Sequence, residues 1–242
     1  MGVRVGTSGW AYRDWRGTFY PPGLRQSAWF THYAGVFDTV EVNYTFYHLP
    51  SETTVERWRK QAPEGFIYAL KGSQQITHRL RLADVDEPLD RFLTRAASLG
   101  DRLGPILWQF PPRWPADAAR LEAFAAKLPS DLVHAFEFRD PSWLTSEIRQ
   151  ILEKQGLTFC IFDMPGLACP KWVTADVIYL RFHGHGQRYA GRYGREALEP
   201  WADQIRRWEK HGHLVYAYFN NTARGHAVED ARELHRLCRA VS

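Results

Sequence analysis

The sequence predicts an α/β protein folded as a single (β/α)8 barrel over residues 1–242. Eight short apolar runs each end in polar residues, and most of them are followed by a stretch with helical spacing of apolar residues. This alternation is typical of a parallel sheet covered by helices. A chain of 242 residues is also close to the roughly 250 that such a barrel needs. No linker or low-complexity tract divides the chain, so we expect one domain.

Each predicted strand leads into a polar side chain. The runs and the residues that follow them are Val3–Gly6 before Thr7, Thr39–Val40 before Glu41, Phe66–Leu70 before Lys71, Ile106–Trp108 before Gln109, Ala135–Phe136 before Glu137, Phe159–Phe162 before Asp163, Val177–Leu180 before Arg181 and Val215–Phe219 before Asn220. In a barrel of parallel strands, the carboxyl ends of the strands form the active-site face. We therefore expect all eight polar residues at one end of the barrel.

Apolar residues at helical spacing predict outer helices within 89–99, 121–128, 148–152, 198–208 and 228–237. Thr145 or Ser146 is placed to cap the third of these. The sixth unit differs, because the segment from Pro165 to Ala175 has no amphipathic stretch and reads as a loop.

Composition favours a soluble protein of the reduced cytoplasm. There is no apolar segment for export or for crossing a membrane, and the three cysteines lack metal-binding spacing. A net charge of +4 favours an anionic small molecule or a nucleic acid as partner. The sequence leaves the oligomeric state open.

Three strand ends carry pairs of polar residues two positions apart, which places both members of a pair on one face of a strand. The pairs are Glu41 with Asn43, Glu137 with Arg139, and Arg181 with His183. Lys71, Gln109, Asp163 and Asn220 can join them at the barrel mouth. Such a cluster is either a self-neutralising ion network or a ligand site. We favour the ligand site, because buried ion pairs add little stability. On that interpretation Glu41→Gln leaves stability nearly unchanged, whereas in a network it lowers stability by several kcal/mol.

The loops after the seventh and eighth strands suggest a phosphate site. Glycines such as Gly184 let backbone N–H groups approach oxygens, and Arg181 and Arg188 can bind them bidentately. The aromatic residues Trp10, Tyr12, Trp15, Tyr44 and Tyr47 crowd the first two loops and could form a wall for a sugar or base.

The residues expected to act on a substrate follow from these patterns. Glu41 or Glu137 would be the general acid or base, with His183 as proton-transfer partner. The expected substrate-binding residues are Thr7, Trp10, Tyr12, Asn43, Tyr47, Lys71, Gln109, Arg139, Asp163, Arg181, Arg188, Asn220 and Asn221. We predict no cofactor. His183 and the carboxylates could hold a divalent metal, but a single strong histidine beside two arginines does not favour one.

We therefore expect an enzyme (a hydrolase, lyase or isomerase) acting on a phosphate-bearing sugar or nucleic-acid substrate. A non-catalytic nucleic-acid binder is one alternative, since basic charge with aromatic loops also suits single strands. A glycoside hydrolase using Glu41 and Glu137 is another, although the surrounding cations do not suit it.

Ordered motifs along the whole chain resemble those of the YecE-like family, domain of unknown function number 72. They include Thr7-Ser8-Gly9-Trp10, Glu41-Val42-Asn43, Ile76-Thr77-His78, Gln109-Phe110-Pro111-Pro112, Glu137-Phe138-Arg139, Arg181-Phe182-His183-Gly184 and Asn220-Asn221. The resemblance implies a TIM barrel similar in architecture to xylose isomerase and endonuclease IV. It implies no particular activity.

Overall fold

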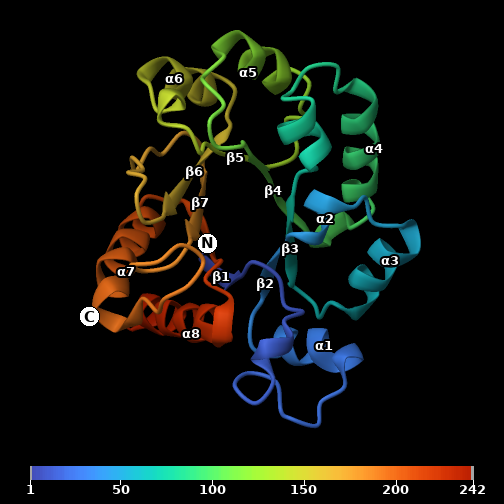
Figure 1. The fold of residues 1–242 in the computed structure, drawn as a ribbon, viewed down its shortest axis with the longest axis vertical. Helices are drawn as coiled ribbons and strands as arrows, with labels where there is room; N and C mark the ends of the chain where they lie inside the picture. The colour runs from blue at the N-terminus through green and yellow to red at the C-terminus, as the bar shows by residue number, and fades with distance from the viewer. Residues whose placement is uncertain (1, 241–242) are drawn as a thin grey trace.

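A ring of eight parallel strands surrounded by helices is the framework of the protein, in a computed structural model that describes residues 2–240 (Figure 1). The strands are β1 (Val3–Thr7), β2 (Thr39–Val42), β3 (Ile67–Lys71), β4 (Leu103–Gln109), β5 (His134–Glu137), β6 (Thr158–Asp163), β7 (Val177–Phe182) and β8 (Leu214–Phe219). Their order in the sheet is β1-β8-β7-β6-β5-β4-β3-β2. A parallel bridge between Ser8 and Glu41 joins the two ends of this sheet, so the predicted (β/α)8 barrel is confirmed.

The helices lie outside the strand ring, and the last five of them overlap the five ranges that the amphipathic spacing predicts. They are α1 (Trp29–Ala34), α2 (Tyr44–Tyr47), α3 (Glu52–Gln61), α4 (Asp86–Ala97), α5 (Ala118–Ala125), α6 (Ser146–Lys154), α7 (Gly194–Lys210) and α8 (His226–Arg239). Thr145 caps α6 by accepting a hydrogen bond from the N–H of Ile148. No described helix is both long and apolar enough to cross a membrane.

The sixth unit has no helix. Residues 164–176 run from β6 to β7 as irregular chain, which confirms the loop predicted there. Trp172 from this loop packs on Phe159 of β6, with 4.9 Å between ring centroids. The loop therefore covers part of the apolar surface that a helix covers in the other units.

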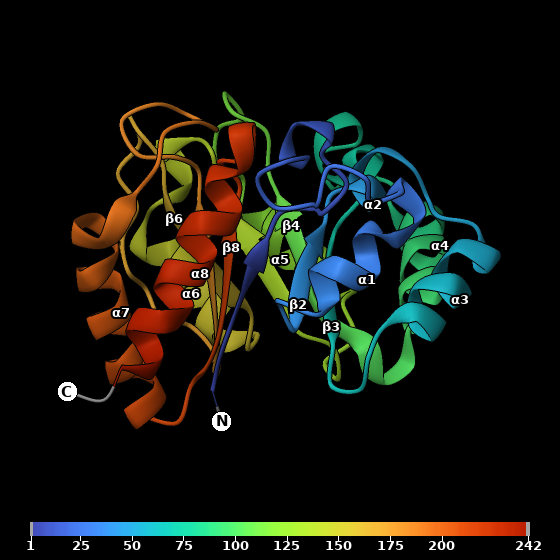
Figure 2. The ribbon, with the colours of Figure 1, turned by 90° about the horizontal axis from the view of Figure 1, so that it is seen from below.

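The barrel interior is filled by alternate residues of the strands. A separate apolar cluster inside the ring contains Ala69, Leu107, Ala135, Cys160, Tyr179, Tyr216 and Tyr218. Residues two positions further along several strands, such as Lys71, Glu137 and Arg181, share this inward face. They lie at the strand ends away from the N-terminus, where the long connecting loops gather (Figure 2). The two-residue period thus turns an apolar interior into a polar mouth.

The seam between β1 and β2 is closed by a side chain. Tyr33 of α1 accepts a hydrogen bond from the N–H of Thr7 and donates one to the carbonyl of Thr39, both at 3.0 Å. Gly6 makes this close approach feasible, because a Cβ there would lie 2.4 Å from the Thr39 oxygen. One phenol therefore links two strands that form few backbone hydrogen bonds with each other.

Removing this hydroxyl should weaken the barrel. We expect Tyr33→Phe to lower the free energy of unfolding by about 1–3 kcal/mol, because a buried N–H and a buried C=O lose their partner. Urea denaturation measures the change. Tyr47→Phe is the matched control, since Tyr47 is 61% exposed. Equal stability of the two variants would show that the seam does not depend on Tyr33.

Candidate functional site

Arg181 lies at the centre of the barrel mouth between two carboxylates. Its Nη2 is 2.6 Å from Glu41 Oε1, and its Nη1 is 2.5 Å from Glu137 Oε2. All three side chains are almost completely buried. Because the partners come from β2, β5 and β7, this ion triad ties together strands that are not neighbours in the sheet.

Glu41 has a hydrogen-bond partner at both oxygens. Ser8 Oγ donates to Oε1 and the Tyr179 hydroxyl donates to Oε2, each at 2.7 Å. Burial would raise the pKa of Glu41, but the charge and hydrogen bond of Arg181 outweigh it and leave the pKa below its usual value. Glu41 is therefore a fixed anion.

Glu137 is held in the same way. Arg139 Nε forms an ion pair with Oε1, and His183 Nε2 lies 3.4 Å from the same oxygen. Burial opposes ionisation, yet Arg139 and Arg181 hold the pKa of Glu137 well below its usual value. A general acid or base needs a pKa near the working pH. The geometry thus gives no support to the expectation that Glu41 or Glu137 transfers protons.

His183 is neutral and bonded at both ring nitrogens. Its Nε2 is 2.9 Å from Arg139 Nη2, and because arginine can only donate, Nε2 accepts and the proton resides on Nδ1. Asn220 Nδ2 lies 3.2 Å from Nδ1, and the opposite assignment of the Asn220 amide would present its oxygen to accept that proton. Burial lowers the pKa of His183 to about 4, despite the nearby Glu137. In this arrangement His183 orients Arg139.

Lys71 is a cation of the mouth that has no ion pair among the described residues. Its Nζ lies 4.1 Å from the centre of the Phe46 ring. Burial and the charge of Arg181 lower the pKa of Lys71 to about 7, although Glu41 and Glu137 oppose the shift. Lys71 was expected only to hold an anion, but this pKa gives the side chain similar amounts of ammonium and amine near neutral pH.

A second histidine lies beside Lys71. His78 is in a π-helical turn, Gln75–Arg79, and contacts Phe46 edge to face at 4.9 Å. Burial and the charges of Lys71 and Arg139 lower its pKa to about 4. The sequence placed His78 beyond the third strand without a role. The π-helical turn, which has no clear signature in the sequence, returns it to the mouth.

Two expected site residues point away from the cluster. Cys160 faces the barrel interior, so the two-residue period turns Asp163 outward, where burial raises its pKa although the Trp201 hydrogen bond and the charges of His185 and Lys171 oppose the shift. Thr7 Oγ1 donates to the carbonyl of Gly9 at 2.7 Å. The expectation that Asp163 joins the cluster was therefore wrong, and Thr7, which was expected only to bind substrate, has its hydroxyl engaged within the protein. Gln109 lies at the mouth and donates to the Phe110 carbonyl at 3.2 Å.

Two residues that bind Glu41 escaped the sequence reasoning. Ser8 follows Thr7 and is the bridge partner of Glu41 in the structure. Because side chains alternate along a strand, Ser8 and not Thr7 points into the barrel. The sequence does not show which of the two residues points inward. Tyr179 lies inside β7 and reads as an ordinary apolar strand residue. Its hydroxyl reaches Glu41 only because the barrel closes.

In the loops after β7 and β8, where the sequence suggested a phosphate site, backbone N–H groups bind a carboxylate of the protein itself. Asp230 of α8 is fully buried and accepts hydrogen bonds from the N–H groups of Tyr193 and Gly194 at 3.0 and 3.2 Å. Asn221 Nδ2 also donates to Asp230, at 2.8 Å. Gly184 is packed against carbonyl oxygens, since a Cβ there would lie 2.1 Å from the Ala190 oxygen. Arg181 is already neutralised, and exposed Arg188 donates to the Pro165 carbonyl. The groups named here therefore already have partners within the protein.

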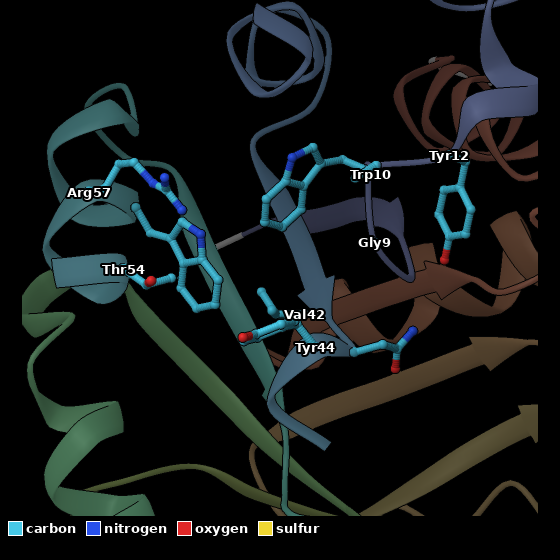
Figure 3. A pocket seen from close by; sticks show the side chains of 10 residues that line it. Gly9, Trp10, Tyr12, Val42, Tyr44, Thr54 and Arg57 are labelled. Carbon is cyan, nitrogen blue, oxygen red and sulfur yellow. The ribbon is translucent and has the colours of Figure 1, made fainter. Parts of the chain in front are cut away.

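A pocket of about 400 Å³ opens beside the cluster, between the first loop and α3 (Figure 3). It is lined by Gly9, Trp10, Ala11, Tyr12, Val42, Asn43, Tyr44, Thr54, Arg57 and Trp58. Trp10, Tyr12 and Tyr44 thus form part of a wall, as expected. Trp15 is instead buried in the core with its indole N–H on the Thr222 carbonyl, and Tyr47 does not line the pocket.

Within residues 2–240, no group of three or more His, Cys, Asp and Glu side chains is arranged to hold a metal ion. The carboxylates of the mouth are instead paired with guanidinium groups.

The geometry of Glu41 favours the ion-network interpretation for this residue and reverses the expected effect of its substitution. We expect Glu41→Gln to lower the free energy of unfolding by roughly 3–5 kcal/mol, because Arg181 would remain buried with one counterion fewer. Denaturant titration at pH 7 measures this. Glu56→Gln, which removes an exposed ion pair with Lys60, should change stability little. Unchanged stability of Glu41→Gln would return us to the ligand interpretation.

The difference in unfolding free energy between the wild type and Glu41→Gln should depend on pH. The pKa of Glu41 is lower in the folded than in the unfolded chain, so its ionised form stabilises the fold above the unfolded pKa of about 4.3. That contribution is lost as the pH falls below this value. The gap in stability between wild type and Glu41→Gln should therefore narrow in acid, and a constant gap would contradict the assignment.

Comparisons with known proteins agree with this architecture. A family model described as "Protein of unknown function DUF72" matches residues 4–241. The UPF0759 protein YunF of Bacillus subtilis (strain 168) is 24% identical over 268 residues, which cover 97% of this chain and 94% of YunF. A DUF72 family protein from Thermotoga maritima, known from a crystal structure, is 29% identical with a TM-score of 0.91, covering 99% of this chain and 100% of that one. A DUF72 family protein from Enterococcus faecalis, 21% identical with a TM-score of 0.84 over 99% of this chain and 96% of its own, shares the fold. Since the family model spans nearly the whole sequence, the chain belongs to the DUF72 family, whose members are proteins of unknown function.

Proposed function

We propose that this protein is an enzyme for a small phosphate-bearing or otherwise anionic substrate, with Lys71 as the group that exchanges a proton with it. The observation that carries the proposal is the Lys71 amine at the barrel mouth, which lies over the Phe46 ring and has no ion pair among residues 2–240; burial lowers its pKa to about 7. A side chain with this pKa is suited to act as general base or general acid at neutral pH.

The charge balance around Lys71 favours an anion as its partner. Glu41 and Glu137 are matched in charge by Arg181 and Arg139, so protonated Lys71 is the charge left over. An anion beside its Nζ would replace the hydration that burial removes. We therefore place the anionic group of the substrate beside Lys71 rather than in the loops after β7 and β8.

The loops around the mouth support the same sign of charge. Basic residues outnumber acidic ones in the loops that follow β1, β3 and β7.

Backbone strain is found in the same set of loops. Every described non-glycine residue with positive φ lies in a loop after a strand: Arg81, Leu82, Asp84, Arg113, Tyr189 and Arg224. Backbone strain of this kind tends to cluster at functional sites.

The reaction class that fits is proton abstraction next to an acidifying group, as in isomerases and lyases. Neutral Lys71 would take the proton, and its ammonium form could return the proton to the same or a neighbouring atom. Arg139, held by Glu137 and His183, would stabilise negative charge that develops on a substrate oxygen. A glycoside hydrolase needs one carboxyl with a raised pKa, and both candidates have lowered ones.

A nucleic-acid binder remains the second candidate because of the basic loops around the mouth. It would bind oligonucleotides without turnover, and its affinity would fall steeply with salt. The enzyme proposal instead expects affinity for a single small oxyanion.

Anion binding should be coupled to proton uptake at Lys71. At pH 8 most Lys71 is neutral, and an anion beside it should raise its pKa, so binding should take up close to one proton. Isothermal titration with sulfate, which does not titrate at this pH, in buffers of different ionisation enthalpy measures the uptake.

Lys71→Met should remove both the uptake and most of the sulfate affinity, whereas Arg207→Ala on the outer face of α7 should leave both unchanged. Sulfate binding that takes up no proton, or that survives in Lys71→Met, would refute the assignment to Lys71.

A further inference from the structure

We propose that the pocket between Trp10, Tyr44 and Trp58 binds a flat nitrogen heterocycle of the nucleobase type, which makes the substrate nucleotide-like. This inference rests on the proposed function, because it takes the pocket and Lys71 as two parts of one substrate site.

Three aromatic rings shape the pocket. The ring of Trp58 is nearly buried, and Trp10 and Tyr44 stand almost perpendicular to it, with interplanar angles of 83° and 89° and centroid distances of 6.2 and 6.3 Å. Tyr44 is 50% exposed. In Figure 3, Trp10 approaches from the first loop while Tyr44 lies near the end of β2, with Thr54 and Arg57 on the α3 side. A planar ligand could therefore stack on an aromatic face without moving the core.

Asn43 supplies an acceptor that lacks a partner. Its Oδ1 is buried and forms no hydrogen bond within the described part of the chain. The side chain precedes α2 without capping it. A buried acceptor without a partner costs free energy, and a ring N–H or exocyclic amine from a ligand would relieve that cost.

The same residue connects the pocket to Lys71. Val42 is paired in register with Leu70, and Asn43 and Lys71 are the residues that directly follow this pair in the two chain segments. Neighbouring strands are about 4.8 Å apart. Because Lys71 itself does not line the pocket, the proposal requires the substituent of a heterocycle bound at Asn43 to extend from the pocket toward β3, where the anionic group was assigned.

The polarity of the lining favours a heterocycle over a bare sugar. Besides the two tyrosines and the tryptophan N–H groups, the side chains that can form hydrogen bonds are Asn43, Thr54 and Arg57. A sugar would bring a hydroxyl on almost every carbon and leave several of them without partners. A nucleobase has two large faces and only a few polar edge atoms, which matches this lining.

The test is calorimetric titration of the full-length protein with the four ribonucleoside 5′-monophosphates, adenosine and ribose 5-phosphate. We expect at least one monophosphate to bind about tenfold or more tightly than ribose 5-phosphate. Tyr44→Ala should weaken that binding roughly five- to 100-fold through lost stacking. Tyr47→Ala should not, because Tyr47 lies on the same short helix but outside the pocket. Asn43→Leu should also weaken binding, without lowering the thermal midpoint.

The outcomes separate this proposal from the one on which it rests. Ribose 5-phosphate binding as tightly as every monophosphate would overturn the heterocycle pocket and leave the anion site at Lys71 intact. Absence of monophosphate binding, or equal effects of Tyr44→Ala and Tyr47→Ala, would also overturn it. Lys71→Met that retains adenosine binding but loses the extra affinity of the monophosphate would support both proposals. Adenosine binding with no contribution from Lys71 would support the pocket alone.

Discussion

The ion triad of Glu41, Arg181 and Glu137 is the interaction on which the barrel mouth depends. A guanidinium is a poor charge to bury, and it persists here because both of its ends meet carboxylates with good geometry. The carboxylates are in turn oriented by Ser8, Tyr179 and Arg139. The charges of these groups are balanced within the protein, although Arg181 Nε has no hydrogen-bond partner among the described residues, and the triad serves as a scaffold. The proton transfer that we propose is therefore assigned to Lys71, which lies beside the triad.

That arrangement explains why one lysine differs so much from the other basic residues. Surface lysines such as Lys60 and Lys127 have carboxylate partners in water, whereas Lys71 is surrounded by arginines whose counterions are already engaged. Desolvation and like charges act in the same direction on its amine. The lowered pKa of Lys71 is thus mainly a consequence of burial, to which the charge of Arg181 adds.

Sequence patterns were sufficient for the framework because the signals were local. The strand ends at Lys71, Gln109 and Asp163 follow from where apolar runs stop, and the loop of the sixth unit follows from missing amphipathicity. Asp163 was misplaced because β6 is apolar on both faces, so nothing in its sequence shows which residues point inward.

Other properties of the mouth depend on contacts between residues that are distant in the sequence. Asp230 is one such case, since a residue in the second turn of α8 occupies the N–H groups that begin α7. The pKa of Lys71 is another, because it depends on charges carried by β2, β5 and β7. Neither the contacts of Asp230 nor the pKa of Lys71 could be predicted from local sequence patterns. Because of them, we propose the anion site beside Lys71 and not in the loops after β7 and β8.

At the seam between β1 and β2, the barrel is closed in part by hydrogen bonds of a single side chain, Tyr33. Gly9 and Trp10 follow one side of this seam, and Val42 and Asn43 belong to the other, yet all four line the same pocket. A molecule bound in this pocket would contact both sides of the seam and so link β1 to β2. Amide hydrogen exchange in β1 and β2 would then report occupancy of the pocket, with slower exchange at the seam when a molecule is bound there.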